Sequence, residues 1–292
     1  MEEFLSKEEQ EAMEEEKRER ERQLEFERNL QLKKLKNSDK VINYKDFIFK
    51  LKQDDTYEVC YCSNLSIKDA EIPKVCNGKP VTSISSRAFE YCDYDSLGLA
   101  ALDSNTIYSI KGTKKCESLE TIEIPDSITN IYDRSPAWFD GTYCIRNTWS
   151  TLLEKVRITI DSNNPSYMIN NGGIYAKDKK TLLCCNGKDK FFAIIDGTTN
   201  IAKHAIADHR NLESLVIPTS VKSFGVHAFP SYNLKAIFYK GTKADWENIS
   251  IAEGNDNELK KKATVYFYSE KKKLFGKCWH YDVDGVTPTT VY

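Results

Sequence analysis

No stretch of the chain holds 18 or more consecutive apolar residues, so the sequence predicts no membrane-spanning helix. An excess of positive charge is also missing. The formal net charge is −2 and the pI is about 6.2, and the clusters of lysine are short. A protein that follows a phosphate backbone needs many cations on one surface, so we expect no nucleic-acid partner.

The N-terminus lacks the basic start and apolar core of a secretory signal, because it begins Met-Glu-Glu and stays charged. We therefore expect a cytoplasmic protein, with the cell surface as the alternative if a leader has been removed. The nine cysteines are an odd number and are scattered along the chain. In a reducing compartment they would be thiols, and buried thiols behave as small apolar groups.

Signatures of catalysis and of metal binding are missing as well. The chain has no Walker loop, no Gly-x-Ser-x-Gly elbow and no His-Glu-x-x-His, and its cysteines lack the Cys-x-x-Cys spacing that suits zinc. His204, His209 and His227 fall inside the repeats described next, where we expect structural roles. We predict no catalytic residue, no metal and no cofactor; a cysteine-dependent enzyme on a repeat scaffold is the enzymatic alternative.

What the chain does contain is a phrase that recurs with a fixed period. The phrase reads Leu-x-x-Ile-x-Ile-Pro-x-x-Val-x-x-Ile-x-x-x-Ala-Phe-x-x-Cys, with imperfect copies at residues 119–131 and 212–229. Ile201 and Phe224 occupy equivalent positions one period apart, as do Ala205 and Ala228. The period is about 23 residues, a spacing that indicates a solenoid, in which each repeat is stable only when stacked on its neighbours.

The phrase also predicts which side chains face the interior. Ile122 and Ile124 are two residues apart, so on a strand both point to the same side, inward. Pro125 then ends the strand because proline cannot donate to a ladder. The Val-x-x-Ile and Ala-Phe segments that follow turn the chain back, and their apolar side chains fill the interior. We predict that Ile217→Asp collapses the fold, because it buries an unpaired charge.

Positions before and between the inward residues point outward and align in two columns. One column holds Glu123, Val216 and Phe238, and the other holds Thr121, Ser214 and Ala236. An exposed valine and phenylalanine side by side would form a modest apolar patch of the kind that marks a partner site. We predict a partner-binding surface formed by Thr121, Glu123, Ser214, Val216 and Phe238.

The fold class is therefore α+β: a repeat solenoid with short strands stacked into a ladder, a charged N-terminal α-helix and a C-terminal cap, which the family resemblance given below identifies as a leucine-rich-repeat solenoid. The composition divides the chain into four segments. They are a charged helix at 1–40, N-terminal capping strands at 41–75, repeats at 76–240 with an inserted hairpin near 165–190, and a C-terminal cap and tail at 241–292. The tail from residue 279 is rich in turn residues, and we expect it to be loosely held.

The N-terminal segment is built from good helix formers, with opposite charges at helical spacing such as Glu14 to Arg18. Its apolar residues do not sustain a heptad, so a coiled coil has only weak support and a charged helix docked on the first repeat is favoured. We expect this helix to tether the protein or to let it self-associate.

The phrase resembles the BspA-like leucine-rich-repeat family, over roughly residues 57 to 270. The likeness rests on Val81–Ile84 with Ala88, Phe89 and Cys92, on 116–125, on 212–229, and on Tyr239 to Thr242 with Asp245, Trp246 and Ile249. The segment from 164 to 183 is similar to an inserted hairpin of that family. The resemblance implies an adhesion or interaction module with no shared catalytic residues.

These observations predict a non-enzymatic scaffold that binds a protein partner of unknown identity through one face of the solenoid. A surface or secreted adhesion protein whose leader has been removed is the alternative. The ligand lies beyond what the sequence specifies.

Overall fold

The computed structural model describes residues 15, 18–20, 22, 41–85, 87–91, 114–131, 156–185, 189–206, 209, 211–229, 233–255, 263–270, 277–282, 285 and 287–290. Residues 15, 18–20 and 22 are helical and exposed, and the rest of the helix predicted at 1–40 lies outside the described residues. Nothing in the described part of this segment supports a coiled coil. The degraded repeat copy around Ala137 and Trp138 also lies outside the described residues.

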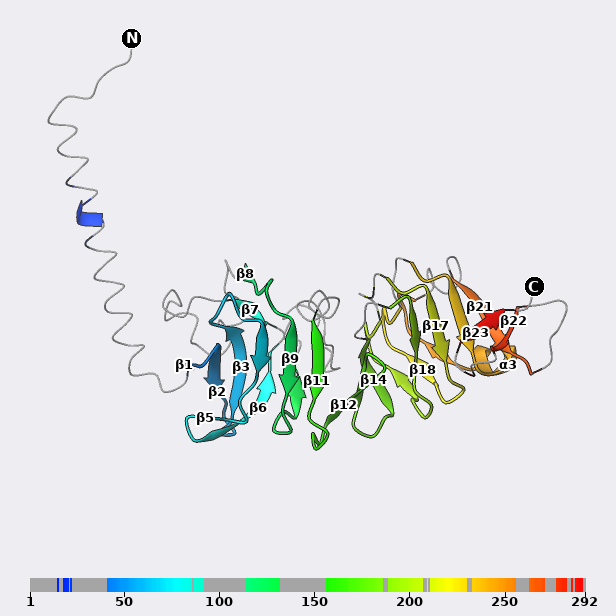
Figure 1. The fold of residues 1–292 in the computed structure, drawn as a ribbon, viewed down its shortest axis with the longest axis horizontal. Helices are drawn as coiled ribbons and strands as arrows, with labels where there is room; N and C mark the ends of the chain where they lie inside the picture. The colour runs from blue at the N-terminus through cyan, green and yellow to red at the C-terminus, as the bar shows by residue number, and fades with distance from the viewer. Residues whose placement is uncertain are drawn as a thin grey trace, which may run out of the picture.

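Each repeat contributes two short strands, one to each of two ladders that enclose the core. In Figure 1 the strands follow one another along the long axis of the molecule in chain order, from blue to red. The first ladder contains β4 (Asp69–Glu71), β9 (Thr121–Ile124), β11 (Arg157–Ile160), β15 (Phe191–Ala193), β17 (Ser214–Ile217), β19 (Ala236–Tyr239) and β21 (Thr264–Tyr268). The second contains β6 (Lys79–Ile84), β10 (Asn130–Ile131), β14 (Thr181–Cys185), β16 (Asn200–Ile201), β18 (Ser223–Phe224) and β20 (Ser250–Ile251).

Strand pairing within both ladders is parallel, and its register reproduces the sequence period. Asn200 pairs with Ser223 at the equivalent position one period later, and Ser214 pairs with Ala236. The inward residues Ile122, Ile124 and Ile217 are fully buried, as the phrase predicts. Successive turns approach closely: a Cβ at Gly225 would lie 2.5 Å from the main-chain nitrogen of Lys203, so glycine fits there and a larger residue does not.

Three antiparallel strands precede the repeats. They are β1 (Val41–Tyr44), β2 (Phe47–Leu51) and β3 (Tyr57–Cys62). Strand β3 is buried along its whole length and pairs in parallel with β6. The antiparallel sheet thus passes directly into the second ladder. β5 (Val75–Cys76) forms a short hairpin with β6, and β7 (Glu90–Tyr91) pairs with β8 (Lys114–Lys115) beside β3.

The period is interrupted in the middle of the chain by β12 (Tyr167–Asn170) and β13 (Gly173–Ala176), which pair antiparallel with each other, β13 also pairing with β14. β14 then pairs in parallel with β16, so the insertion enters the second ladder. In the first ladder it separates the sheet β4–β9–β11 from the sheet that begins with β15. The Tyr167 hydroxyl accepts from the Ile131 amide at 3.1 Å and donates to the Thr129 oxygen at 3.2 Å. Tyr167 thereby satisfies main-chain groups at β10.

Beyond the last repeat, the helix α3 (Lys243–Glu247) begins with a capping box between Thr242 and Asp245. Strand β22 (Cys278–Tyr281) pairs in parallel with β21, and β23 (Pro288–Thr290) pairs antiparallel with β22. The prediction of a loosely held tail from residue 279 is wrong, because Trp279 is fully buried. The buried Trp279 ring anchors the described part of this segment, although the turn-rich sequence suggested weak contacts.

Candidate functional site

On the β4–β9–β11 sheet, the outward side chains are polar and mostly charged. Thr121 and Glu123 point outward from β9, with Asp69 and Glu71 beside them on β4. Thr121 is half-buried and donates its hydroxyl to the Asp69 carboxylate at 2.6 Å, while Glu123 is exposed. Arg157 stands opposite Thr121 on β11. We call this surface the charged face; its residues are Asp69, Glu71, Thr121, Glu123, Arg157 and Thr159.

On the sheet from β15 to β21, the same two columns are uncharged and largely apolar. The register aligns one column through Phe191, Ser214, Ala236 and Thr264, and the other through Ala193, Val216, Phe238 and Tyr266. The prediction that Val216 and Phe238 form an exposed patch is wrong, since their exposed fractions are 1% and 6%. The structure brings these two residues together as register partners, but the C-terminal segment covers them.

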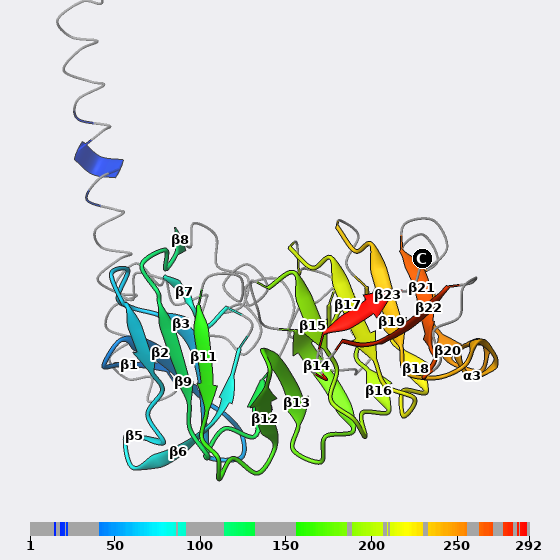
Figure 2. The same cartoon turned by 45° about the vertical axis from the view of Figure 1, so that its right-hand side comes forward.

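Trp279 is the residue that covers Val216 and Phe238. Its ring centroid lies 5.5 Å from that of Phe238, and Val216, Phe238 and Trp279 form one buried cluster. Figure 2 shows β22 and β23 crossing the outer side of this sheet. The alternation of Trp279 and Tyr281 at strand spacing is the signal in the sequence that could have revealed the cover.

Around this cluster, aromatic side chains remain partly accessible. Tyr266 stacks on Phe238 with ring centroids 5.5 Å apart, and Tyr281 meets Trp279 edge-on at 4.9 Å. Tyr268 is exposed and also contacts the Trp279 ring. We call this surface the aromatic face; its accessible residues are Phe191, Ala193, Ser214, Ala236, Tyr266, Tyr268 and Tyr281.

The predicted site residues therefore divide between two surfaces. Ser214, Val216 and Phe238 lie on the adjacent strands β17 and β19, whereas Thr121 and Glu123 lie on β9 in a separate sheet. Ser214 is half-buried on the aromatic face. The predicted columns are confirmed where Val216 pairs with Phe238 and Ser214 with Ala236, but Thr121 and Glu123 lie in a separate sheet and are not joined to those residues by register.

A row of alternating charges runs beside the aromatic face, one residue before the strands. Glu213 lies between two lysines, with its carboxylate oxygens 2.8 Å from Lys190 Nζ and 2.7 Å from Lys235 Nζ. Hydrogen bonds from these ammonium groups lower the pKa of Glu213 to about 2. The three side chains tie three successive turns together at the surface.

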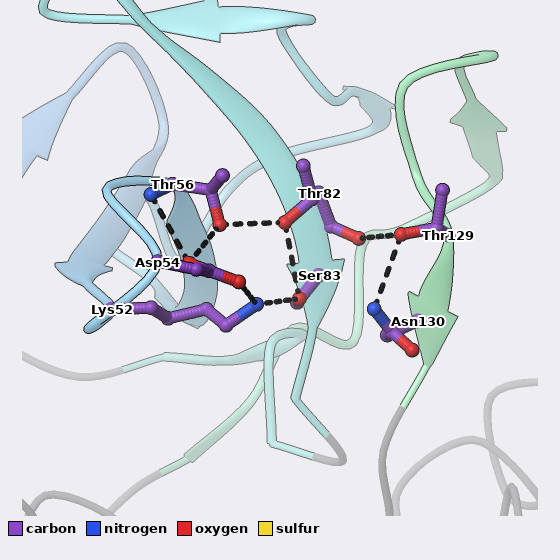
Figure 3. Close-up of polar contacts among 7 residues, drawn as sticks. All are labelled: Lys52, Asp54, Thr56, Thr82, Ser83, Thr129 and Asn130. Carbon is purple, nitrogen blue, oxygen red and sulfur yellow. Dashed lines mark hydrogen bonds and ion pairs between the residues drawn. The ribbon is translucent and has the colours of Figure 1, made fainter.

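A polar cluster occupies the N-terminal part of the second ladder (Figure 3). The Lys52 ammonium donates to Asp54 at 3.0 Å and to the Ser83 hydroxyl at 3.1 Å, and Thr56 and Thr82 join the network at 2.8 Å. The same pattern of stacked hydroxyls and amides recurs further along, where Ser223 donates to Asn200 at 2.8 Å.

Lys52 contacts Ser83, and some hydrolases use a lysine and a serine in contact as base and nucleophile. Here an ammonium that donates to both a carboxylate and a hydroxyl has no lone pair to offer as a base. Ser83 is also fully buried. The cluster therefore links neighbouring strands by hydrogen bonds, and Thr129 extends it toward β10 by donating to the Thr82 oxygen at 3.5 Å.

Comparison with known proteins agrees with the architecture. The family model of the BspA type leucine-rich-repeat region matches residues 54–146 and 183–253, in six copies. Together the two matched ranges span just over half of the chain. The chain belongs to the BspA-type leucine-rich-repeat family. No curated protein matches it.

Solved structures similar to this BspA-type chain are bacterial leucine-rich-repeat proteins. One from Eubacterium ventriosum is 17% identical, with 79% of this chain and 72% of that chain covered and a TM-score of 0.37. One from T. pallidum is 15% identical, with 78% and 86% covered and a TM-score of 0.33. A leucine-rich cell surface protein from Faecalibacterium prausnitzii is 15% identical, with 74% and 99% covered and a TM-score of 0.23.

The described part of this BspA-type solenoid holds no group of three or more His, Cys, Asp or Glu side chains placed to bind a metal ion. Among the same residues, no helix is both long and apolar enough to cross a bilayer. Cys116 and His209, which occupy the cysteine position of the repeat, are buried, and burial lowers the pKa of His209. Their burial agrees with the expectation that buried thiols act as small apolar groups and that His209 has a structural role, while Cys92 lies outside the described residues.

Proposed function

We propose that the chain is a non-enzymatic protein-binding module and that the aromatic face is the surface that meets its protein partner. One observation carries the proposal. The outward positions of the two columns from β15 to β21 hold no charged residue, whereas the charged face holds Asp69, Glu71, Glu123 and Arg157 at the equivalent positions. The cores of protein interfaces are depleted of charge and rich in aromatic residues.

Repeat scaffolds of this kind use extended surfaces for recognition, and membership of the BspA-type family supports the same reading. Ser214 would contact the partner from the aromatic face. Val216 and Phe238 would act beneath Trp279 by holding it in place. Thr121 and Glu123 would supply polar contacts if the partner extends to the charged face.

The ends of the solenoid take supporting roles in this proposal. The strands β1 to β3 would cover the apolar end of the first repeat, and α3 with β21 to β23 would cover the last. Residues 1–40 would tether the protein or let it self-associate. Sedimentation of the full chain tests the last point, and a monomer at every concentration measured would contradict self-association.

The binding proposal is tested with two matched variants of the full chain. Tyr266→Lys with Tyr268→Lys places two positive charges on the aromatic face. Thr121→Lys with Thr159→Lys places the same two charges at outward positions of the charged face, beside Asp69 and Glu123 respectively. Both proteins are first checked for an unchanged far-ultraviolet circular dichroism spectrum.

Each variant and the natural sequence are then used to capture proteins from a lysate of the source cells. Captured proteins are compared quantitatively, and binding of the recovered partner is measured directly by calorimetry. We expect the partner to bind the aromatic-face variant about tenfold more weakly or worse, because the introduced ammonium groups are desolvated in the complex. Loss of binding only with the charged-face variant would move the site to that face, and full binding by both would exclude both surfaces.

A further inference from the structure

Two cysteines from distant parts of the chain meet at the end of β3. Cys62 is the last residue of β3 and pairs with Tyr91 on β7, which in turn pairs with Lys114 on β8. Cys116 follows β8 directly. Two steps of strand pairing thus bring together residues that lie far apart in the sequence.

The two thiols share one hydrogen-bond partner, which places them close together. Cys62 Sγ lies 3.0 Å and Cys116 Sγ lies 4.0 Å from the main-chain oxygen of Asn64. Both cysteines also belong to one buried cluster. Both side chains are buried, so the two sulfurs meet inside the protein and not at its surface.

We propose that Cys62 and Cys116 form a reversible disulfide when the chain folds in the presence of a small-molecule disulfide such as oxidised glutathione. The Cys62 thiolate attacks one sulfur of the oxidant and releases one reduced thiol. The Cys116 sulfur, after losing its proton, then displaces the second. Two protein thiols and one oxidised glutathione give one protein disulfide and two reduced glutathiones, so atoms and electrons balance.

The protonation of the pair fits this order of events. The hydrogen bond from Cys116 lowers the pKa of Cys62, and the same contact with burial raises the pKa of Cys116. Cys62 is therefore the attacking thiolate and Cys116 the resolving thiol. By contrast, burial raises the pKa of Cys76 to about 11 and raises that of Cys185 as well.

The cross-link would join the antiparallel N-terminal strands to the repeats. It would connect β3 to the turn after β8 and close a loop that starts at Cys62 and returns at Cys116. A disulfide that closes a long loop stabilises mainly by restricting the unfolded chain, so oxidation should raise the melting temperature.

The test refolds the full chain from urea, fully reduced, into buffers of oxidised and reduced glutathione at mildly alkaline pH. Refolding lets every cysteine reach the oxidant, so burial in the native state cannot hide the pairing. Proteolysis without reductant, followed by mass spectrometry, identifies the linked peptides. We expect one predominant intramolecular link, between Cys62 and Cys116, and a rise in melting temperature on the order of 5 °C that dithiothreitol reverses.

Cys62→Ser and Cys116→Ser should each remove both the linked peptide and the temperature shift. Cys76 is a buried cysteine in the hairpin of β5 and β6. Cys76→Ser is therefore the matched control and should retain the linked peptide and the temperature shift. Recovery of Cys62 and Cys116 as separate thiols or as glutathione adducts would overturn the proposal, as would predominant linkage to any other cysteine. The peptide map of the natural sequence decides the matter even if a variant fails to fold.

Discussion

The indole N–H of Trp279 donates to the main-chain oxygen of Tyr239 across 2.8 Å. This hydrogen bond fixes strand β22 above the first ladder, and the Trp279 ring then lies against Phe238. Buried indoles normally find such a partner, because an unpaired N–H in an apolar site is costly. Strand β22 is thereby part of the folded solenoid and determines which portion of the aromatic face stays accessible.

Trp279→Ala should lower the free energy of unfolding by about 3–5 kcal/mol, the usual cost of removing a large buried ring. Trp279→Phe should cost less, because a ring still covers Val216 and Phe238. It should nevertheless lose the hydrogen bond to the Tyr239 oxygen, a loss of about 1 kcal/mol. Urea unfolding of the three proteins, followed by circular dichroism, measures the differences.

Tyr268→Ala is the control for this series, since Tyr268 lies beside Trp279 but is exposed. We expect a cost of about 1 kcal/mol or less for its removal. If Trp279→Ala costs no more than Tyr268→Ala, then the segment from Cys278 to Tyr281 is not anchored as the contacts indicate.

Ile217→Asp tests the direction in which the ladder residues point. Ile217 is fully buried at the end of β17, so its replacement by aspartate places an unpaired carboxylate in the core. We expect the cooperative thermal transition to disappear at neutral pH. Circular dichroism during heating provides the measurement.

Ser214→Asp is the matched control on the same strand. Ser214 points outward and is half-buried, so a carboxylate there keeps access to water, and the transition should remain cooperative. A protein with Ile217→Asp that melts like the natural sequence would show that the inward assignment is wrong. Loss of folding with Ser214→Asp alone would lead to the same conclusion.

The sequence was sufficient for the family, for the repeat period and for the inward residues such as Ile122 and Ile217, because these follow from a strict spacing of apolar side chains. It was sufficient, too, for the pairing of Val216 with Phe238, since equivalent repeat positions become register partners. The second strand in each turn was missed. Strands such as β16 are two residues long, too short to show an alternating pattern.

The exposure of the candidate site could not be predicted in the same way. A repeat pattern predicts on which side of the strand a side chain lies, but it does not predict which later segment of the chain covers that side chain. The cover comes from Trp279, which lies far along the chain from Val216 in a stretch that has no repeat character. Likewise, the meeting of Cys62 with Cys116 depends on the pairing of β3, β7 and β8, which no local spacing encodes.

The stability of the repeats should depend on pH through Glu213. Its pKa is lowered to about 2 in the folded chain, from an ordinary value of 4.5, by Lys190 and Lys235. A carboxylate with a depressed pKa stabilises the folded state fully above the unfolded pKa, and the contribution is lost as the pH falls toward the folded value. The effect should therefore be complete above about pH 4.5 and disappear near pH 2. Melting temperatures measured from pH 7 to pH 2 at low salt test this.

Glu213→Gln should melt below the natural sequence at pH 7, and the two curves should converge as the pH falls from 4.5 to 2. High salt should narrow the gap at pH 7, because exposed ion pairs are screened. Glu123→Gln is the control for the change in net charge. Glu123 stands opposite Glu71 in the ladder, where like charges destabilise, so its removal should not lower the melting temperature at pH 7. If Glu213→Gln instead ran parallel to the natural sequence across the whole pH range, the bridge from Lys190 through Glu213 to Lys235 would contribute nothing measurable in solution.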